Sequence, residues 1–473
     1  MTEKYDLIVI GGGPAGEKGA SKAAYYGKRV ALVERAPYLG GAGINTGTVP
    51  SKTLRETALY FSGLQQRGLY GLDYSFKKNL SIKDFMFRER NVVDNERKII
   101  EKTVRRHNIT VIQGEGSLKD AHTVHVKSPN SEIDIHGEII LIATGSSPVH
   151  SPDIPFDGKL IYDSDSILHM DHIPKTMAVV GGGVIGTEYA SIFTALGIKV
   201  TLIEPRGGIV SFVDSEIAKR LMNQLTTLGL NFIFDDRMVT IEPQKDHVKL
   251  TLEKGGMHNF EVALIAAGRQ SNVEGLGLEQ MGIKMGKRGL ILVDENYRTN
   301  IPNIFAVGDV IGFPALASTS MEQARAAIVH AFDLEYKERL APFVPFAVYA
   351  IPEISSIGLT EDECKEKNIP YLIGRAYYEE NARGQIIGDL CGMIKLVFSP
   401  VDKKLLGAHI IGEQASELIH IASHVMLGNG VIDAFIEAVY NYPTLSDSFQ
   451  YAAYDGLNNL DKWVEANNNA KSP

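Results

Sequence analysis

Cysteine is scarce in this chain of 473 residues, which contains only Cys364 and Cys391. The two stand far apart in the sequence, in no spacing typical of a metal centre or a redox dithiol. This excludes a disulfide-stapled fold and is typical of proteins in a reducing compartment. The N-terminus has no basic segment followed by an apolar stretch, so we expect no signal peptide and a cytoplasmic protein.

Excess positive charge and long apolar runs are also missing. The formal net charge is -9, which argues against nucleic acid as a partner because nucleic-acid-binding surfaces are basic. No run approaches the roughly 18 consecutive apolar residues of a membrane span, so we expect no membrane partner. Hydrophobic residues nevertheless make up 44% of the chain. That is enough for large cores in two to four domains, at ~100–200 residues per domain.

What the chain does contain is a strand, glycine loop, helix and strand at its start. Leu7–Ile10 is a short apolar run, followed by the first glycine loop, residues 11–16 with the sequence GGGPAG. We expect a helix over Ala15–Tyr26 and a second strand over Val30–Val33 that ends at Glu34. This order within ~30 residues predicts a βαβ unit.

The same unit occurs a second time. The apolar run Met177–Val180 precedes the second glycine loop, residues 181–186 with the sequence GGGVIG. A helix reaching Gly197 and a strand over Val200–Ile203 follow, and that strand ends at Glu204. Glu204 stands as far from the start of its loop as Glu34 does from the start of the first.

Each glycine in these loops has a mechanical task. The first permits the tight turn out of the strand, the second lets the backbone approach a pyrophosphate, and the third lets the helix pack on the sheet. The helix N-terminus offers free N–H groups to phosphates, and the acidic residue can accept hydrogen bonds from a ribose diol. One such loop could be an ordinary glycine turn, whereas two complete copies predict two sites for two different dinucleotides.

The rest of the chain adds helices over residues 52 to about 64 and 82–106, and three strands that end at Gly145, Gly268 and Asp309. From about Pro345 short strands and two amphipathic helices indicate an α+β region. The predicted fold class is therefore α/β, with two Rossmann-like dinucleotide-binding domains and a C-terminal α+β domain.

Residues 40–52, GGAGINTGTVPSK, resemble the redox-centre segment of the pyridine nucleotide–disulfide oxidoreductases, such as dihydrolipoamide dehydrogenase and glutathione reductase. In that family two cysteines flank four residues, and the matching positions here are Gly43 and Thr48. Neither can form a disulfide or supply a thiolate. The resemblance spans the whole chain through the segments 143–145, 267–269, 306–309 and 351–358.

The resemblance implies FAD at the first glycine loop and NAD(H) or NADP(H), as substrate, at the second. It implies an FAD-binding domain over residues 1–150 and 276–345, an NAD(P)-binding domain over 151–275 and a dimerisation domain over 346–473. The expected partners are nicotinamide nucleotides and a second copy of the chain.

The resemblance also implies roles for single residues. It places Lys52 near flavin N5, paired with Glu188, and it assigns Asp309 to the ribityl chain of the flavin. Without the resemblance, Lys52 would be interpreted as an ordinary surface residue of a helix. The expected FAD-binding residues are Gly11, Gly13, Pro14, Ala15, Gly16, Glu34, Gly41, Thr48, Lys52, Thr144, Gly145, Asp309 and Ala317. The expected NAD(P)-binding residues are Gly181, Gly183, Gly186, Glu204, Arg206 and Gly268.

A second departure from the family accompanies the missing cysteines. The family's thiol chemistry uses a His–Glu pair contributed across the dimer, and the matching residues here are Tyr442 and Asp447. A tyrosine, with an ordinary pKa of about 10, is a poor proton acceptor at neutral pH. We expect Lys52, Glu188 and Tyr442 at the catalytic positions, without any machinery for reducing a disulfide.

The branch that this pattern resembles is the soluble FAD-containing pyridine nucleotide transhydrogenases, through residues 162–168, 186–193 and 441–444. That branch usually keeps a cysteine at the position of Gly43. The implied activity is hydride transfer between NAD(H) and NADP(H) through FAD without a redox disulfide. The alternatives are an NAD(P)H dehydrogenase that reduces a quinone, dye or metal acceptor, and a non-catalytic nucleotide-sensing homodimer.

Two details of the sequence leave alternatives open. Glu204 favours NAD because its charge repels a 2′-phosphate, whereas Arg206 could pair with that phosphate or could be a solvated loop arginine. Glu417, His420 and His424 share a helix face, but no further ligand is evident, so we expect no metal.

Overall fold

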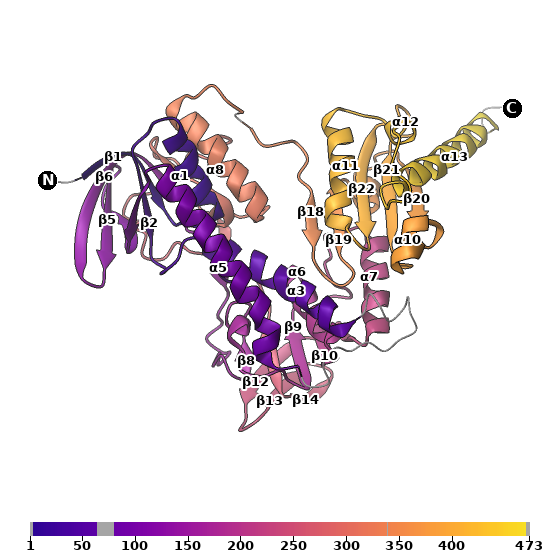
Figure 1. The fold of residues 1–473 in the computed structure, drawn as a ribbon, viewed down its shortest axis with the longest axis horizontal. Helices are drawn as coiled ribbons and strands as arrows, with labels where there is room; N and C mark the ends of the chain where they lie inside the picture. The colour runs from indigo at the N-terminus through magenta and orange to yellow at the C-terminus, as the bar shows by residue number, and fades with distance from the viewer. Residues whose placement is uncertain (1–2, 64–79, 338, 470–473) are drawn as a thin grey trace.

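The structure is a computed structural model that describes residues 3–63, 80–337 and 339–469. Its elements gather around three large sheets, seen at the left, bottom and right of Figure 1. The expected α/β class, with two Rossmann-like units and a C-terminal α+β unit, is confirmed. Within the described ranges, no helix is both long and apolar enough to cross a membrane.

The first sheet has the strand order β3-β2-β1-β6-β5-β4, and β17 pairs with β6. Strands β3, β2, β1, β6 and β17 are parallel, and β4 and β5 form an antiparallel extension. The strands are β1 (Glu3–Ile10), β2 (Val30–Glu34), β3 (Thr110–Gln113), β4 (Glu115–Leu118), β5 (Thr123–Ser128), β6 (Ser131–Ile142) and β17 (Ile304–Ala306). The return of β17 brings a distant segment of the chain to the sheet that carries the first glycine loop.

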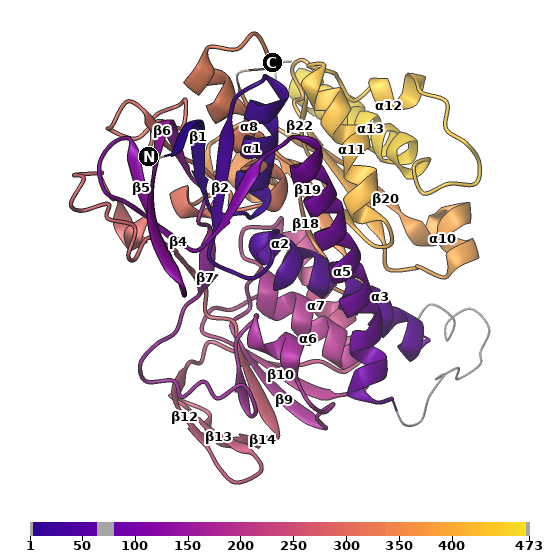
Figure 2. The same cartoon turned by 60° about the vertical axis from the view of Figure 1, so that its left-hand side comes forward.

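Helices cover this sheet and extend away from it (Figure 2). They are α1 (Pro14–Tyr25), α2 (Gly41–Asn45), α3 (Thr48–Ser62), α5 (Ile82–Arg106), α8 (Ala317–Phe332) and the 3-10 turns η2 (Lys287–Gly289) and η3 (Gly308–Ile311). Apolar residues of α3 and α5 share one core with α6 of the second unit, where the Phe85 and Phe193 rings lie 6.3 Å apart. The two Rossmann-like units are therefore held together by a continuous core.

The second sheet is parallel and has the order β11-β10-β9-β15-β8. Its strands are β8 (Ile161–Tyr162), β9 (Thr176–Val180), β10 (Lys199–Glu204), β11 (Asn231–Phe234) and β15 (Val262–Ile265), with η1 (Ser166–His169), α6 (Val184–Ala195) and α7 (Ser215–Leu228). An antiparallel sheet of β12 (Met238–Pro243), β13 (Val248–Leu252) and β14 (Gly256–Phe260) packs beside it, and β7 (Ser146–Pro148) pairs with β16 (Arg269–Ser271).

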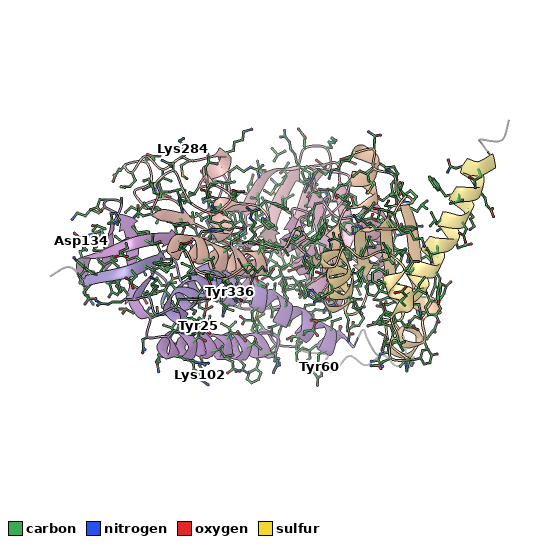
Figure 3. The ribbon with its side chains drawn as sticks, turned by 90° about the horizontal axis from the view of Figure 1, so that it is seen from above. Tyr25, Tyr60, Lys102, Asp134, Lys284 and Tyr336 are labelled. Atoms are coloured by element: carbon green, nitrogen blue, oxygen red, sulfur yellow. The ribbon has the colours of Figure 1, made fainter. Side chains whose placement is uncertain are left out.

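The third sheet is antiparallel, with the order β18-β19-β22-β21-β20. Its strands are β18 (Phe346–Val348), β19 (Ile354–Gly358), β20 (Leu372–Tyr377), β21 (Met393–Phe398) and β22 (Leu405–Ile411). Its helices are α9 (Glu361–Glu366), η4 (Tyr378–Glu380), α10 (Ala382–Ile387), α11 (Ala415–Leu427), α12 (Ala434–Glu437) and α13 (Ser448–Asn469). The last part of α13 extends beyond the rest of the molecule (Figure 3).

A buried lysine cluster joins the third sheet to the second unit. The Nζ of Lys395, on β21, lies 2.9 Å from Asp214, 3.0 Å from Glu216 and 2.8 Å from Glu361. The side chains of Lys395 and Asp214 are 0% exposed, and Arg375 also pairs with Glu216 at 2.9 Å. Because Asp214 caps α7 and Glu361 begins α9, the cluster fixes these helices relative to the sheet.

Candidate active site

The first glycine loop closes onto its own sheet. The Gly11 N–H donates to the Val33 carbonyl at 2.8 Å, and Gly11 has φ +104°, with only 2.4 Å between a Cβ built there and the Ala143 oxygen. A Cβ on Gly16 would lie 1.8 Å from the Gly11 oxygen. Only glycine fits either position, because both contacts are to backbone atoms.

The second glycine loop repeats this geometry. Gly181 has φ +109°, and a Cβ on Gly186 would lie 1.9 Å from the Gly181 oxygen. A Cβ on Gly183, by contrast, would meet nothing within 4 Å, and one on Gly13 would meet only the Gly41 Cα at 3.7 Å. The middle glycines therefore border open space, as the approach of a ligand requires.

Helices α1 and α6 begin at these middle glycines without a side-chain cap. Gly13 and Gly183 are the N-cap residues and have extended backbone conformations. Pro14 occupies the first turn of α1, where its missing N–H costs no hydrogen bond. The remaining free N–H groups and the helix dipole suit a diphosphate, so the residues present fit a dinucleotide at each loop.

The two acidic residues lie at matching positions. Glu34 Oε2 accepts from the Gly12 N–H at 2.7 Å, and Glu204 Oε2 accepts from the Gly182 N–H at 2.6 Å. Both side chains are buried at the end of the second strand of their unit. A carboxylate fixed in this way presents acceptor lone pairs to a ribose diol. Arg206 Nε donates to Glu204 Oε1 at 2.7 Å, and the Arg206 side chain is 58% exposed.

Lys52 and Glu188 form an ion pair between α3 and α6. Lys52 Nζ lies 2.7 Å and 2.9 Å from the two carboxylate oxygens, and the Glu188 side chain is only 4% exposed. Ser51 Oγ lies 3.4 Å from Glu188, and the Tyr349 N–H donates to Glu188 at 2.9 Å. The Tyr349 ring lies 4.9 Å from Lys52 Nζ. Lys52 is thus a held cation and not a free surface lysine.

Position 43 is closed to a side chain. Gly43 lies in α2, and a Cβ built there would come 2.6 Å from Pro14 Cγ. Thr48 is the first residue of α3. Gly41 packs against Gly13, since a Cβ on Gly41 would lie 2.7 Å from the Gly13 Cα. The segment from Gly41 to Thr48 therefore packs on the first glycine loop, and positions 43 and 48 carry no thiol.

Asp309 lies in a network of polar side chains at the junction of the two Rossmann-like units. Ser146 Oγ donates to Asp309 at 2.7 Å, and Arg269 Nε donates to Ser146 Oγ at 2.9 Å. Arg269 also pairs with Asp165 at 3.8 Å. Burial raises the pKa of Asp165 more than Arg269 lowers it. These hydrogen bonds fix the Asp309 carboxylate beside the end of β17.

The other expected binding residues surround the same region. Thr144 Oγ1 donates to the Asn272 carbonyl at 2.7 Å, and Ala317 is the first residue of α8, which begins without a side-chain cap. The methyl group of Ala15 lies against Gly308, since a Cβ built on Gly308 would be 3.4 Å from it. A Cβ on Gly145 or Gly268 would meet nothing within 4 Å.

Tyr442 is not part of this arrangement within one chain. It is 76% exposed on the third unit, and among the described residues no hydrogen bond or ion pair joins it to Lys52 or Glu188. Asp447, which matches the acid of the family's His–Glu pair, acts on Tyr440. Burial, together with the negative charge of Asp447, raises the pKa of Tyr440 to about 12.

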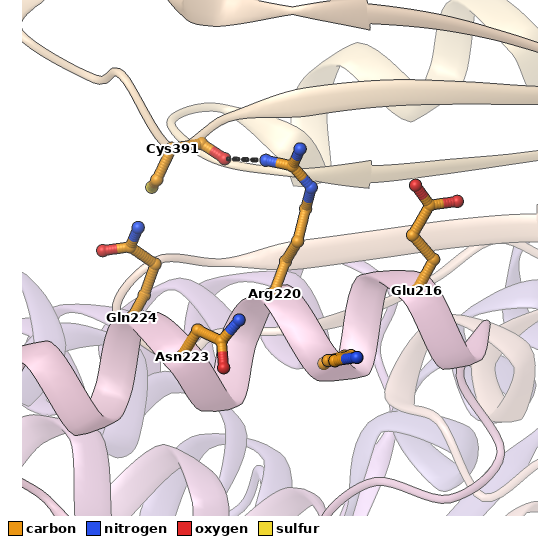
Figure 4. Close-up of a pocket in the computed structure, with 6 residues that line it drawn as sticks. Glu216, Arg220, Asn223, Gln224 and Cys391 are labelled. Carbon is orange, nitrogen blue, oxygen red and sulfur yellow. Dashed lines mark hydrogen bonds between the residues drawn. The ribbon is translucent and has the colours of Figure 1, made fainter.

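The remaining candidates lie away from the glycine loops. His424 Nδ1 lies 2.7 Å from the His420 carbonyl, and within the described ranges no three His, Cys, Asp or Glu side chains are grouped as metal ligands. A cleft of about 340 Å³ lies between α7 and the turn at Cys391, lined also by Arg220 (Figure 4). Lys52 and Glu188 do not line this cleft.

Sequence reasoning missed Tyr349, Ser146 and Asn272. Each makes its contact with a residue more than a hundred positions away. No local pattern in the sequence announces such contacts, because they depend on how the three units pack.

Two matching glycine loops on two Rossmann-like units, joined by the Lys52–Glu188 ion pair, fit the class of proteins with two dinucleotide-binding folds. The chain belongs to the pyridine nucleotide-disulphide oxidoreductase family: residues 5–331 match the family, and residues 344–453 match its dimerisation domain. The family consists of flavin-dependent oxidoreductases that use FAD and NAD(P)H.

Among its relatives is a protein of Mycobacterium tuberculosis named soluble pyridine nucleotide transhydrogenase. It is 42% identical over 459 residues, which cover 97% of this chain and 98% of that protein. A protein of the same name from Colwellia psychrerythraea is 39% identical over 460 residues, covering 96% of this chain and 98% of that protein.

Two solved structures share the fold. The HOCl-induced flavoprotein disulfide reductase RclA from Escherichia coli superposes with a TM-score of 0.85 at 27% identity, covering 94% of this chain and 98% of that one. LpdA from Mycobacterium tuberculosis superposes with a TM-score of 0.89 at 25% identity, covering 96% and 99%.

Proposed function

We propose that this protein transfers hydride between NAD(H) and NADP(H) through FAD, without a redox disulfide. One observation carries the proposal: the two units that carry matching glycine loops are joined by the Lys52–Glu188 pair, and no thiol lies at position 43 or 48. The relatives named soluble pyridine nucleotide transhydrogenase support it.

In this proposal, the residues of the protein bind FAD and the nicotinamide nucleotide and orient them relative to each other. When bound, the flavin supplies the hydride acceptor and donor. We propose that the first glycine loop, Glu34, Gly41, Thr48, Lys52, Thr144, Gly145, Asp309 and Ala317 hold FAD, and that Gly181, Gly183, Gly186, Glu204, Arg206 and Gly268 hold the nicotinamide nucleotide.

Lys52 is proposed to place a cation where negative charge develops on the flavin. Glu188 is buried, and its bonds from Ser51 and the Tyr349 N–H fix its carboxylate. That carboxylate in turn fixes the Lys52 ammonium group, so the charge is already in position when hydride arrives. No general base is needed for this chemistry, which is consistent with tyrosine at position 442.

We further propose a homodimer in which Tyr442 reaches the partner's flavin site. The dimerisation-domain match and the 76% exposure of Tyr442 support this arrangement. We propose that the chain consists of three domains, each built around its own large sheet. They are an FAD-binding domain (1–150 and 276–345), an NAD(P)-binding domain (151–275) and a dimerisation domain (346–473). The relatives named soluble and the low cysteine content support a cytoplasmic location.

Steady-state assays of the FAD-loaded protein test the proposed function. NADPH is offered with the thionicotinamide analogue of NAD⁺, and the reduced analogue is followed by its own absorbance. We expect turnover with this pair and none with flavin-free protein. A protein that binds FAD but produces no reduced analogue would refute the proposal.

A second candidate is an NAD(P)H dehydrogenase that reduces a quinone, dye or metal ion. The position facing the first glycine loop carries no disulfide, and a solved neighbour of this fold is a Cu(II) complex of a flavoprotein disulfide reductase. The same assay with a quinone or Cu(II) in place of the analogue separates the two candidates. Failure to bind FAD at all would instead favour a non-catalytic homodimer.

A further inference from the structure

The loop between β18 and β19 brings the third unit against the Lys52–Glu188 pair. Tyr349 lies in this loop, directly after β18, and its backbone N–H donates to Glu188 Oε1 at 2.9 Å. Its ring centroid lies 4.9 Å from Lys52 Nζ, within the range of a cation–π interaction. One residue of the third unit therefore contacts both members of an ion pair that joins the first two units.

The Lys52 ammonium group is held by hydrogen bonds to Glu188 and Ser51. Its Nζ lies 2.7 and 2.9 Å from the two Glu188 oxygens and donates to Ser51 Oγ at 3.2 Å. The Lys52 side chain is nevertheless 27% exposed, and a lysine reaches its partners on a flexible four-carbon stem. Contact with an aromatic face adds a further restriction, so the Tyr349 ring limits where the ammonium group can lie.

The Tyr349 side chain is itself held inside the third unit. The Ser416 hydroxyl, at the start of α11, donates to Glu353 Oε2 at 3.0 Å and interacts with the Tyr349 hydroxyl. Glu353 is buried, and burial raises its pKa more than the charge of Arg55 lowers it. Burial also raises the pKa of Tyr349, so its hydroxyl is neutral near pH 7. Tyr349 therefore acts on Lys52 through its ring and not through a phenolate charge.

Arg55 fastens this loop to the helix that carries the lysine. It lies one turn after Lys52 on α3, and its Nε donates to the Ala350 carbonyl at 2.9 Å. The Arg55 side chain is only 7% exposed, so this bond is shielded from water. At the other end of the loop the Gly412 N–H donates to the Glu353 carbonyl at 2.9 Å. The position of the ring relative to the lysine is therefore fixed from both units.

We propose that Tyr349 is a positioning residue whose ring holds the Lys52 ammonium group in place for the reaction. The inference rests on the proposed function, in which Lys52 stabilises negative charge on the reduced flavin. A lysine that can leave this position stabilises that charge less. The ring thus makes electron uptake by the flavin depend on the docking of the third unit against α3.

Two substitutions separate the ring from the backbone contact, since neither removes the N–H that bonds Glu188. Tyr349→Leu removes the ring. For this variant we expect the midpoint potential of bound FAD to become more negative and flavin reduction by NADPH, followed by stopped flow, to slow about two- to fivefold. Tyr349→Phe keeps the ring and should stay within about twofold of wild type. The potential is measured against a redox dye, so this readout needs no nicotinamide.

A double variant shows whether the ring acts through the lysine. In a Lys52→Met background, Tyr349→Leu should change neither the potential nor the rate any further. Tyr336→Leu is the matched control, because the Tyr336 ring (Figure 3) also lies against a lysine, 3.1 Å from Nζ of Lys22 in the last turn of α1. It should leave the potential and the rate unchanged. Tyr349→Met replaces Tyr349→Leu if the leucine variant does not fold.

Three results would overturn the inference and leave the proposed function standing. They are a wild-type potential and rate in Tyr349→Leu, equal losses with and without Lys52, and an equal loss in Tyr349→Phe, which would assign the effect to the hydroxyl. Bound FAD that NADPH cannot reduce in the wild type would instead refute the proposed function, while the effect of Tyr349 on the potential could still be measured with the dye.

Discussion

At the residue scale, the glycines of the second loop divide into those that the fold needs and one, Gly183, that packing inside the protein does not require. Position 186 must be glycine because a Cβ there would lie 1.9 Å from a backbone oxygen. Gly183, by contrast, borders open space. The extended backbone of Gly183, with φ -75°, is accessible to any residue. A methyl group at position 183 would therefore disturb a bound nucleotide and not the protein.

We predict that Gly183→Ala folds with an apparent melting temperature close to wild type. Replacing the N-cap glycine by alanine should cost about 1 kcal/mol or less. Affinity for NAD⁺, measured calorimetrically, should fall about tenfold or more, because the methyl group occupies the diphosphate approach. Gly186→Ala should instead yield little folded protein.

Gly428→Ala is the matched control for this prediction, since Gly428 has φ -80° and its Cβ would make only ordinary contacts at 3.6 Å. It lies in the third unit and should leave nucleotide affinity unchanged. Unaltered NAD⁺ binding by Gly183→Ala would show that the second loop does not hold the diphosphate.

A second prediction at this scale concerns the held cation. Lys52→Met should slow reduction of the flavin by NADPH roughly 10- to 100-fold in stopped-flow measurements, because a preorganised charge is lost. It should also destabilise the protein, since Glu188 is left buried without its cation.

The double variant Lys52→Met/Glu188→Gln should recover stability without recovering the rate. Lys119→Met removes an exposed lysine that pairs with Asp134 and serves as the control, because an exposed ion pair contributes little to stability. A Lys52→Met enzyme with wild-type reduction kinetics would remove Lys52 from the catalytic account.

The roles of single residues could be predicted unevenly from the sequence. The Lys52–Glu188 pair followed from the resemblance, and Glu34 and Glu204 followed from the strand–loop–helix pattern. The bond between Arg206 and Glu204 could not be predicted, because a loop arginine two residues from a glutamate can equally face solvent. The Tyr349 contact to Glu188 spans 161 positions and has no local signal.

At the element scale, α5 was predicted at its observed bounds, Ile82–Arg106. Ser81 and Asp84 form a capping box at its start, and Arg105 and Arg106 occupy its last turn. Such end signals are local, so the sequence carries them.

Helix α3 begins at Thr48, four residues before the predicted start. The difference arises because Pro50 lies in the first turn of α3, where a helix tolerates proline. The observed end is Ser62, with Gly63 in a left-handed conformation; the predicted end near residue 64 lies outside the described residues.

The buried lysine cluster between β21, α7 and α9 could not be predicted, since Lys395 and Asp214 are 181 positions apart. We predict that Lys395→Met destabilises the protein by about 3–5 kcal/mol near neutral pH, because it leaves buried carboxylates unpaired. Chemical denaturation against the Lys119→Met control measures the loss. A loss no larger than that of the control would contradict the prediction.

The cluster also predicts a pH dependence. Burial acts to raise the pKa of Glu361, but hydrogen bonds from Lys365 and Lys395 outweigh it and lower the pKa from 4.5 to about 2. A folded-state pKa below the unfolded value adds stability above pH 4.5 that is lost as the pH falls toward 2. The stability difference between wild type and Lys395→Met should therefore narrow over this window in acid-denaturation curves. A constant difference would show that Glu361 does not depend on Lys395.

At the scale of the whole molecule, the two Rossmann-like units share a core built from α3, α5 and α6. The arrangement leaves the flavin as the last redox group on the chain, since positions 43 and 48 carry glycine and threonine. Without thiols at these positions, no disulfide can form there to accept electrons from the flavin. The electrons that enter from one nicotinamide must leave directly from the flavin to the next acceptor.

Anaerobic titration of the FAD-loaded protein with NADPH, followed by addition of NAD⁺, tests this account most directly. We predict that one equivalent of NADPH per flavin bleaches the flavin absorbance completely and that NAD⁺ restores it. Flavin that NADPH does not bleach, or that stays bleached in the presence of NAD⁺, would contradict the account.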